Sequence, residues 1–131
     1  MNEINLVLDS NEYVFHFNNN TSILKLLKLK AKIYLNNLIF KEVIRNIRRE
    51  TIKYFINLLK NPRFVVIEEK IPQILIGKYK RQGLKKGDVI IAAFCDYVNA
   101  DYLVSENRHF LKSARFDKFK VLDLNTFLKM I

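Results

Sequence analysis

The sequence KKGDVIIAAFCDYVNADYLVSENRHFLK, residues 85–112, decides the fold. Gly87 and Asp88 predict the start of a helix, with Asp88 as its N-cap. Apolar residues then recur at helical spacing: Ile90, Ala93, Phe94 and Tyr97. A short apolar strand at Tyr102–Val104 and a polar exit at residues 105–109 follow. Because chemistry in an open α/β sheet lies beyond the carboxyl ends of its strands, we expect Asp88 and Asn107 to meet at one edge.

Strand-like and helical segments alternate along the whole chain. The expected strands are Ile4–Leu8, Lys32–Leu35, Phe64–Ile67, Tyr102–Val104 and Phe119–Leu122. Four of the expected helices span residues 10–17, 36–50, 52–59 and 124–130. Three more are expected: one capped by Ser22, one that follows Gly87, and one opened by Pro72 with Ile74, Leu75 and Tyr79 as its apolar residues. No tight hairpin signal is present, so the pattern predicts one α/β domain over residues 1–131, with a mostly parallel sheet and helices on both faces.

The composition limits the class of protein. The chain has 131 residues, half of them apolar, which favours a folded core over disorder. Its net charge of +10 favours a polyanionic partner such as RNA or an acidic protein, although a solvated basic surface explains the charge equally simply. Cys95 is the single cysteine, which predicts a buried inert thiol and a cytoplasmic protein. Neither a signal peptide nor a membrane-spanning segment is expected.

Several kinds of site are disfavoured by the sequence. There are three glycines and neither a GxGxxG nor a P-loop motif, which argues against dinucleotide and P-loop nucleotide binding. Cys95, His16 and His109 are too few and too dispersed for a zinc site. Asp9-Ser10-Asn11 lacks the second aspartate expected of a phosphoaspartyl enzyme.

Three carboxylates fall where this architecture places active sites. Asp9 ends the first strand, Glu42 lies early on a helix, and Asp88 opens another helix. Taken singly, Asp9 and Asp88 also fit a helix cap, and Glu42 also fits a solvated surface position. Taken together, they form a set of oxygen ligands of the kind that Mg²⁺ or Mn²⁺ prefers.

Four motifs in order resemble the PIN-domain family, and more narrowly the VapC-type toxins. They are VLDSN at Val7–Asn11, a glutamate at Glu42, GDVIIAA at Gly87–Ala93, and ADYLVSENRHF at Ala100–Phe110. The resemblance covers nearly the whole chain. It implies a three-layer α/β/α domain with about five parallel strands, and a ribonuclease dependent on Mg²⁺ or Mn²⁺.

The resemblance also implies roles for individual residues. Asp9, Glu42 and Asp88 match the acidic positions of the family. The fourth position, usually aspartate, is Asn107 here, preceded by the matching Ser105. Asn107 removes one negative charge, which weakens the case for a second metal. Asn11 matches a family asparagine and is expected to orient Asp9 or a bound water.

Neighbouring charged residues divide into two groups. Asp101 precedes the strand that leads to Asn107, and six extended residues span up to about 20 Å, so a capping or turn role is expected for it. Glu106 adjoins Asn107, but adjacent side chains on an extended segment point apart. Four residues flank the expected site and are candidates to hold the RNA backbone: Lys85, Lys86, Arg108 and His109.

Three functions remain open from the sequence. The first is an endoribonuclease that is the toxin of a toxin–antitoxin pair, with a cognate antitoxin as its partner. The second is a PIN-like RNA-binding or regulatory protein without catalysis, which the neutral Asn107 motivates. The third is an RNA-processing nuclease that has no antitoxin. A homodimer is also expected from the resemblance, with the helices at residues 23–29 and 52–59 as candidate faces that core packing explains equally well.

Overall fold

A parallel sheet forms the centre of the molecule. The computed structural model describes residues 3–18, 23–112 and 116–131. Within these residues the sheet has five strands: β1 (Ile4–Leu8), β2 (Ala31–Asn36), β3 (Phe64–Ile67), β4 (Tyr102–Val104) and β5 (Lys120–Leu122). All four pairs of neighbours are parallel, in the order β3-β2-β1-β4-β5. The predicted α/β sheet and its five strands are confirmed.

The strand order creates a topological switch point at the carboxyl ends of β1 and β4, and we call this edge of the sheet the crevice. From β1 the chain moves outward to β2 and β3, and it later returns to β4 and β5 on the other side of β1. The segments that follow β1 and β4 therefore lead to opposite halves of the sheet. In open α/β sheets, ligands bind at the point where the strand order reverses in this way. Leu8 is in register with Val104, and Val104 with Leu122. The next residues along the chain, Asp9 and Ser105, thus leave the sheet side by side.

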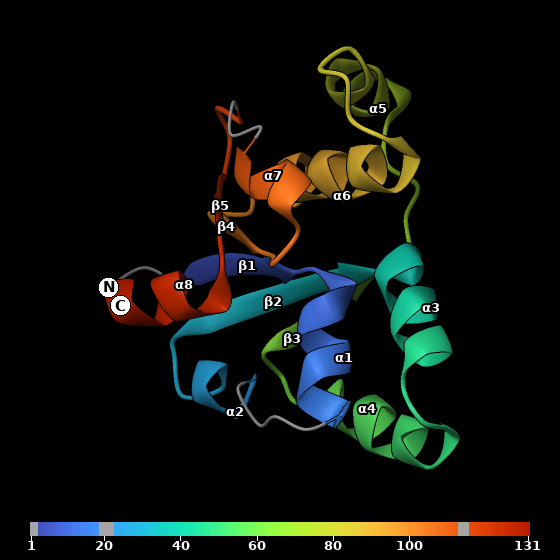
Figure 1. Cartoon of the computed structure of the whole chain (residues 1–131), viewed down its shortest axis with the longest axis vertical. Helices are drawn as coiled ribbons and strands as arrows, with labels where there is room; N and C mark the ends of the chain where they lie inside the picture. The colour runs from blue at the N-terminus through green and yellow to red at the C-terminus, as the bar shows by residue number, and fades with distance from the viewer. Residues whose placement is uncertain (1–2, 19–22, 113–115) are drawn as a thin grey trace.

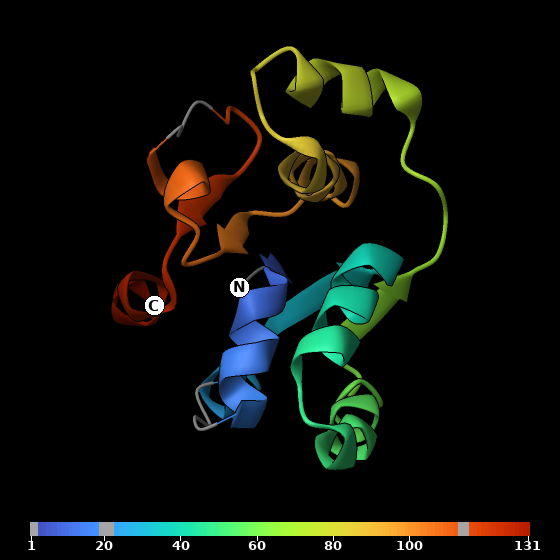
Figure 2. The same cartoon turned by 45° about the vertical axis from the view of Figure 1, so that its right-hand side comes forward.

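Helices cover both faces of the sheet. They are α1 (Ser10–Asn18), α2 (Ile23–Leu26), α3 (Asn37–Asn46), α4 (Ile52–Leu58), α5 (Gln73–Lys80), α6 (Lys86–Tyr97), α7 (Arg108–Lys112) and α8 (Leu124–Met130). Figure 1 places α5 and α6 on one side of the sheet and α1, α2 and α4 on the other, and the turned view in Figure 2 keeps this division. None of the helices in the described ranges is long and apolar enough to cross a membrane.

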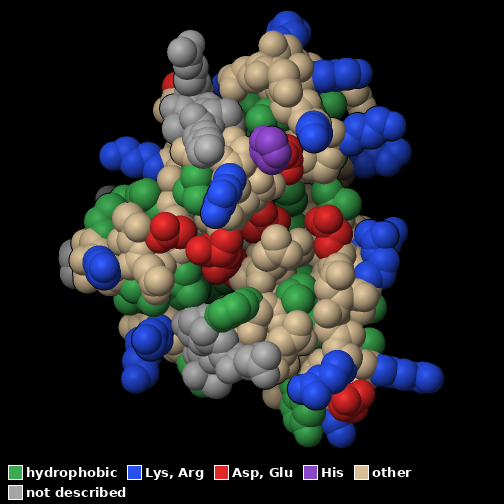
Figure 3. Space-filling view, viewed as in Figure 1, with side chains coloured by type: hydrophobic (Ala, Val, Ile, Leu, Met, Phe, Trp, Pro, Cys, Tyr) green, Lys and Arg blue, Asp and Glu red, His purple; other side chains and the backbone are tan. Residues whose placement is uncertain are grey.

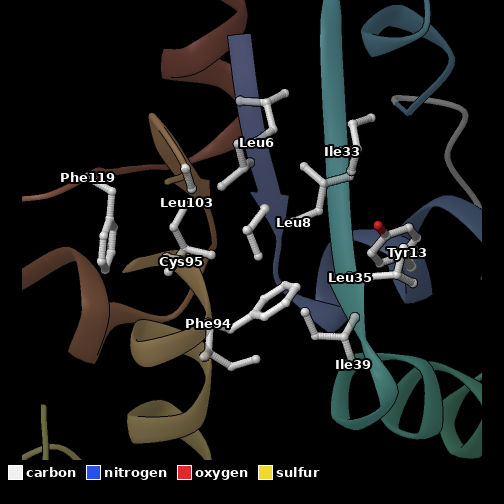
Figure 4. Close-up of a cluster of buried hydrophobic side chains, with 14 of the residues drawn as sticks. Leu6, Leu8, Tyr13, Ile33, Leu35, Ile39, Phe94, Cys95, Leu103 and Phe119 are labelled. Carbon is white, nitrogen blue, oxygen red and sulfur yellow. The ribbon is translucent and has the colours of Figure 1, made fainter. Parts of the chain in front are cut away.

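Helix α6 is buried on more than one side. It packs against α5, and its buried residues are Val89 and residues 91–95. Of the predicted stripe, Ala93 and Phe94 are buried, whereas Ile90 and Tyr97 are only half-buried. Figure 4 shows Phe94 and Cys95 on one side of the β1–β2 pair and Tyr13 of α1 on the other. Burial of a side chain such as Phe94 contributes about 1.5–3 kcal/mol. The expected buried thiol is confirmed, and its burial raises the pKa of Cys95 well above its ordinary value.

The start of α6 differs from the prediction. Lys85 is the N-cap in extended geometry (φ −77°, ψ 164°), and the amide of Val89 donates a 2.8 Å hydrogen bond to the Lys85 carbonyl. Asp88 is therefore the third residue of the helix, so its prediction as the N-cap was wrong. An acidic side chain in the first turn is favoured by the helix dipole and does not have to mark the helix boundary.

Other boundaries confirm or correct the sequence patterns. Asn36 caps α3, because its Oδ1 accepts a 3.0 Å hydrogen bond from the amide of Ile39. The helix does not reach Glu50 as predicted, since Ile47 is extended (φ −103°, ψ 158°) and buried, and a 3₁₀ turn follows at Arg49–Thr51. Ile74 was predicted on an apolar face but is 78% exposed. The predicted cap Ser22 lies outside the described residues.

Candidate active site

Asp9 is held at the carboxyl end of β1. Its amide donates a 2.9 Å hydrogen bond to the carbonyl of Val104, which fixes its backbone against β4. Its Oδ1 accepts a 2.8 Å bond from the amide of Ser10, and its Oδ2 accepts a 2.8 Å bond from Oγ of Ser105. The residue is 8% exposed. Asp9 is thus a buried carboxylate with a defined orientation.

Ser105 connects Asp9 to the following turn. It is fully buried after β4, and its amide donates to the carbonyl of Leu122 at 3.0 Å. While its hydroxyl donates to Asp9, the same Oγ accepts a 3.0 Å hydrogen bond from the amide of Asn107. One hydroxyl therefore fixes both the first acidic residue and the polar exit of β4.

Asn107 bridges the start of α7 and the start of α6. Its Oδ1 accepts a 2.9 Å hydrogen bond from the amide of His109, which is the capping arrangement of a helix that begins at Arg108. Its Nδ2 donates to Oδ1 of Asp88 at 3.4 Å. The sequence-based expectation that Asp88 and Asn107 meet at one edge is confirmed. The contact is between an amide donor and a carboxylate, and the amide oxygen is engaged by α7.

The carboxylates interact electrostatically across the crevice. Burial is the largest cause that raises the pKa of Asp9, and the charge of Asp88 adds to it, against hydrogen bonds from Ser105 and Ser10. Burial also raises the pKa of Glu42 on α3, and the charges of Asp9 and Asp88 raise it further, while Arg45 lowers it. Figure 3 shows acidic side chains gathered in the middle of one face of the molecule. Three elements thus bring Asp9, Glu42 and Asp88 within electrostatic reach of one another.

The residues present fit a divalent cation in their chemistry. Asp9, Glu42 and Asp88 supply hard oxygen donors, and burial, together with nearby negative charge that a cation offsets, raises the pKa values of Asp9 and Glu42. In the described ranges, no three Asp, Glu, His or Cys side chains are grouped closely enough to be a closed set of metal ligands. The arrangement is therefore an open set of donors around a crevice, and Mg²⁺ characteristically keeps several waters in such a site.

Comparison with known proteins identifies the fold. No protein-family model matches the chain, and no curated protein matches it. The solved structure of the PIN domain of RRP44 from T. brucei is similar over 98% of this chain and 81% of that chain, with a TM-score of 0.59 and 13% sequence identity. The chain has the fold of a PIN domain. At this identity the likeness concerns the fold, and the chemistry rests on the residues themselves.

The predicted basic flank lies at two helix starts of the PIN fold. Lys85 and Lys86 are exposed at the start of α6, close in sequence to Asp88. Arg108 and His109 are exposed at the start of α7, directly after Asn107. Lysine and arginine side chains surround the acidic centre of the face in Figure 3. This distribution suits a substrate whose phosphates contact both positive charge and the acidic centre.

Two further sequence expectations concern residues beside the site. Asp101 has a structural role, because its Oδ2 accepts a 2.8 Å hydrogen bond from the amide of Asn5, at the end of the sheet opposite the crevice. Asn11 is exposed on α1 and lines a groove there, while the hydrogen bonds described for Asp9 come from Ser10 and Ser105.

Sequence reasoning missed Glu12, a buried carboxyl beside the site. It is 5% exposed, and its Oε2 has no hydrogen-bond partner within the described part of the chain. Burial raises the pKa of Glu12 to about 9, with further contributions from a hydrogen bond to Glu106 and from the charges of Glu106, Asp9 and Asp123. The available signal was its position three residues after Asp9, which on a helix puts both on one side. A glutamate in the first turn of a helix interacts favourably with the helix dipole, so the sequence gives no reason to expect a further role for it.

Proposed function

We propose that this chain is a divalent-metal-dependent endoribonuclease of the PIN type, which hydrolyses RNA phosphodiesters with an activated water. The observation that carries the proposal is the placement of three carboxylates at the crevice of the sheet: Asp9 is buried after β1, Asp88 contacts Asn107 after β4, and Glu42 lies within reach of the charges of Asp9 and Asp88. Unneutralised carboxylates repel a phosphate, so this arrangement is suited to RNA only when a cation reverses the local charge. The net charge of +10 supports a polyanionic substrate.

The chain's own residues have separate tasks in this mechanism. Asp9 and Asp88 would hold the cation, and the hydroxyl of Ser105 keeps the carboxylate of Asp9 in its orientation. When bound, Mg²⁺ or Mn²⁺ would polarise the phosphodiester and lower the pKa of a bound water. Glu42 is the candidate to take the proton from the attacking water, because its carboxylate lies near those of Asp9 and Asp88, and burial and their charges raise its pKa.

The basic flank positions the substrate. Lys85, Lys86 and Arg108 contact phosphates on either side of the one that reacts, and the imidazole of His109 lies beside Arg108 at the start of α7. These contacts contribute affinity without sequence information, since phosphates are the same in every RNA.

A cleavage assay with a matched variant tests the proposal. Purified protein is incubated with structured RNA and Mg²⁺ or Mn²⁺, then with EDTA, then with metal restored. We expect cleavage that EDTA stops and metal restores, and a loss of about a hundred-fold or more in Asp88→Asn with the thermal unfolding midpoint kept. Full activity of Asp88→Asn, or activity that EDTA leaves unchanged, would remove the proposed site.

A second candidate function is RNA binding without catalysis. Asn107 supports it, because its oxygen is engaged by His109 and it brings no negative charge to the cation. A Mn²⁺ titration distinguishes the two candidates. RNA affinity without Mn²⁺ affinity in the same protein would favour the binding protein over the enzyme.

The cellular role is a further part of the proposal. The resemblance to VapC-type toxins supports a cytoplasmic toxin, a homodimer and a cognate antitoxin, whereas an RNA-processing nuclease lacks the antitoxin. Expression in a bacterial host, alone and together with the reading frame next to its own gene, separates these roles. Growth arrest that the neighbouring gene product relieves would favour the toxin, and growth unaffected by the active enzyme would favour RNA processing.

A further inference from the structure

A groove adjoins the candidate active site between α1 and α8. It has a volume of about 580 Å³, which is within the usual range for small-molecule sites. Helix α1 contributes one face, including Phe15 and Asn18, and α8 contributes Asn125 and Leu128. Glu106 also lines the groove. Its lining is thus a mixture of apolar surface, amides and carboxyl groups.

Two residues that line the groove are close in sequence to residues of the candidate active site. Glu12 lines it, and the amide of Glu12 donates a 3.0 Å hydrogen bond to the carbonyl of Asp9. On the other wall, Glu106 directly precedes Asn107, whose amide contacts Asp88. Both walls of the groove thus include a residue that is close in sequence to the candidate active site.

We propose that the groove is a nucleobase subsite that takes an unstacked guanine of the RNA; this inference rests on the proposed function. Phe15 is 60% exposed, so it offers a flat aromatic surface on which a base can stack. Exposed aromatic side chains recognise single-stranded RNA bases in this way. The groove accommodates a planar base between this ring and α8.

Glu106 selects the base in this proposal. Its Oε2 accepts a 3.2 Å hydrogen bond from the amide of Leu124, and its carboxyl group also bonds to Glu12, so two contacts orient it. Guanine has two adjacent N–H donors on its Watson–Crick edge, which match the two oxygens of a carboxylate. Uracil lacks this pair of donors.

RNA is favoured over a basic peptide as the occupant. Three asparagines, Asn11, Asn18 and Asn125, line the groove, and their amides can bond to both donors and acceptors of a base. Lys25 also lines it, and this positive charge suits a phosphate and opposes an arginine-rich segment.

A binding experiment tests the subsite separately from cleavage. The Asp88→Asn protein is titrated by fluorescence anisotropy with an oligouridylate of about ten nucleotides, and with the same strand carrying one guanine or one inosine. We expect guanine to raise affinity about five-fold or more, and inosine, which lacks the 2-amino group, to raise it less. Phe15→Ala should lower the affinity for the guanine strand about five-fold or more, and Glu106→Gln should abolish the preference.

Tyr54→Ala is the matched control, because Tyr54 is 58% exposed on α4, outside the groove. It should leave the guanine preference unchanged. Equal affinity for all three strands, or a preference that survives both Phe15→Ala and Glu106→Gln, would overturn the subsite while RNA cleavage by the wild type would still support the nuclease. Guanine-dependent binding by a wild-type protein that never cleaves RNA would support the subsite and remove the nuclease. An arginine-rich peptide that binds the groove without displacing the guanine strand would also overturn the subsite.

Discussion

Oγ of Ser105 donates a 2.8 Å hydrogen bond to Oδ2 of Asp9, two residues that are 96 positions apart in the sequence. Both are buried, and both directly follow strands that pair in register. The same oxygen accepts the amide of Asn107. This single hydroxyl therefore joins the carboxyl ends of β1 and β4 and sets the geometry of the candidate site.

Removal of that hydroxyl should affect both stability and function. Ser105→Ala leaves a buried carboxylate and a backbone amide each without one partner, so we expect the free energy of unfolding to fall by about 1–3 kcal/mol. The pKa of Asp9, already raised by burial, should rise further because a hydrogen bond that lowers it is lost. Urea unfolding and Mn²⁺ titration measure the two effects. Ser105→Thr keeps a hydroxyl and should retain most metal affinity; if Ser105→Ala matches the wild type in both measurements, the bridge is unimportant.

The buried Glu12 should make stability depend on pH. The pKa of Glu12 is about 9 in the folded state and 4.5 as its ordinary value, so the folded chain binds more protons between these values. Stability is therefore highest below about pH 4.5 with respect to this group and is lost as pH rises towards 9. Glu12→Gln removes the ionisation, and we expect it to raise the free energy of unfolding near pH 8 by about 1–4 kcal/mol more than near pH 4.

Glu68→Gln is the control for this experiment, since Glu68 is exposed. It should show the same pH dependence as the wild type in urea unfolding. Parallel pH profiles for Glu12→Gln and the wild type would mean that Glu12 is ionised without cost in the folded protein.

The sheet was predictable from sequence because each strand is a short apolar run with a clear end. Asp9 was recognisable for the same reason, as the first polar residue after Leu8. The exact start of α6 was not, since Asp88 satisfies the preferences of both an N-cap and a first-turn acid. Burial against a neighbouring element could not be predicted from the sequence, which explains why Ile74 was expected on an apolar face and why the buried Glu12 was missed.

In the candidate site, the sequence predicted which residues lie close together but not which of their atoms face each other. Sequence order placed Asp88 and Asn107 at one edge, because parallel strands share their carboxyl ends. It could not show that the oxygen of Asn107 is used to cap α7 and that its amide nitrogen faces Asp88. Which atom of an amide faces the site depends on neighbours that only the folded chain brings together.

The basic flank should contribute to RNA affinity in a salt-dependent way. In the Asp88→Asn background, RNA affinity should fall steeply with salt, because bound phosphates displace counterions. Replacement of Lys85 and Lys86 by alanine should reduce the slope of log affinity against log salt by about one to two units. Alanine at Lys118 and Lys120, which lie at the opposite end of the sheet, is the matched control and should leave the slope unchanged. Equal slopes for the two double variants would place the RNA elsewhere.

Asn107→Asp should lower the stability of the metal-free protein and raise its affinity for metal. The new carboxylate keeps an oxygen for the amide of His109 but replaces an amide donor 3.4 Å from Asp88 with a negative charge. Without metal, the free energy of unfolding should fall by about 1 kcal/mol through this repulsion. A carboxylate about 4 Å from a cation is worth about 4 kcal/mol before desolvation and repulsion are subtracted, so a net gain of about 1 kcal/mol, or several-fold in Mn²⁺ affinity, is expected. Unchanged affinity for Mg²⁺ and Mn²⁺ would put Asn107 outside the metal site.

The proposed function depends on a divalent cation held by Asp9 and Asp88, with Glu42 beside it. The most direct measurement is the anomalous diffraction of a crystal of the wild-type protein soaked in Mn²⁺, with an Asp88→Asn crystal soaked in parallel. The account predicts an anomalous peak in the crevice, within direct or water-mediated contact of Asp9 and Asp88, that is lost or much weaker in the variant. A Mn²⁺ peak elsewhere, or a crevice with ordered carboxylates and no peak at saturating Mn²⁺, would contradict it.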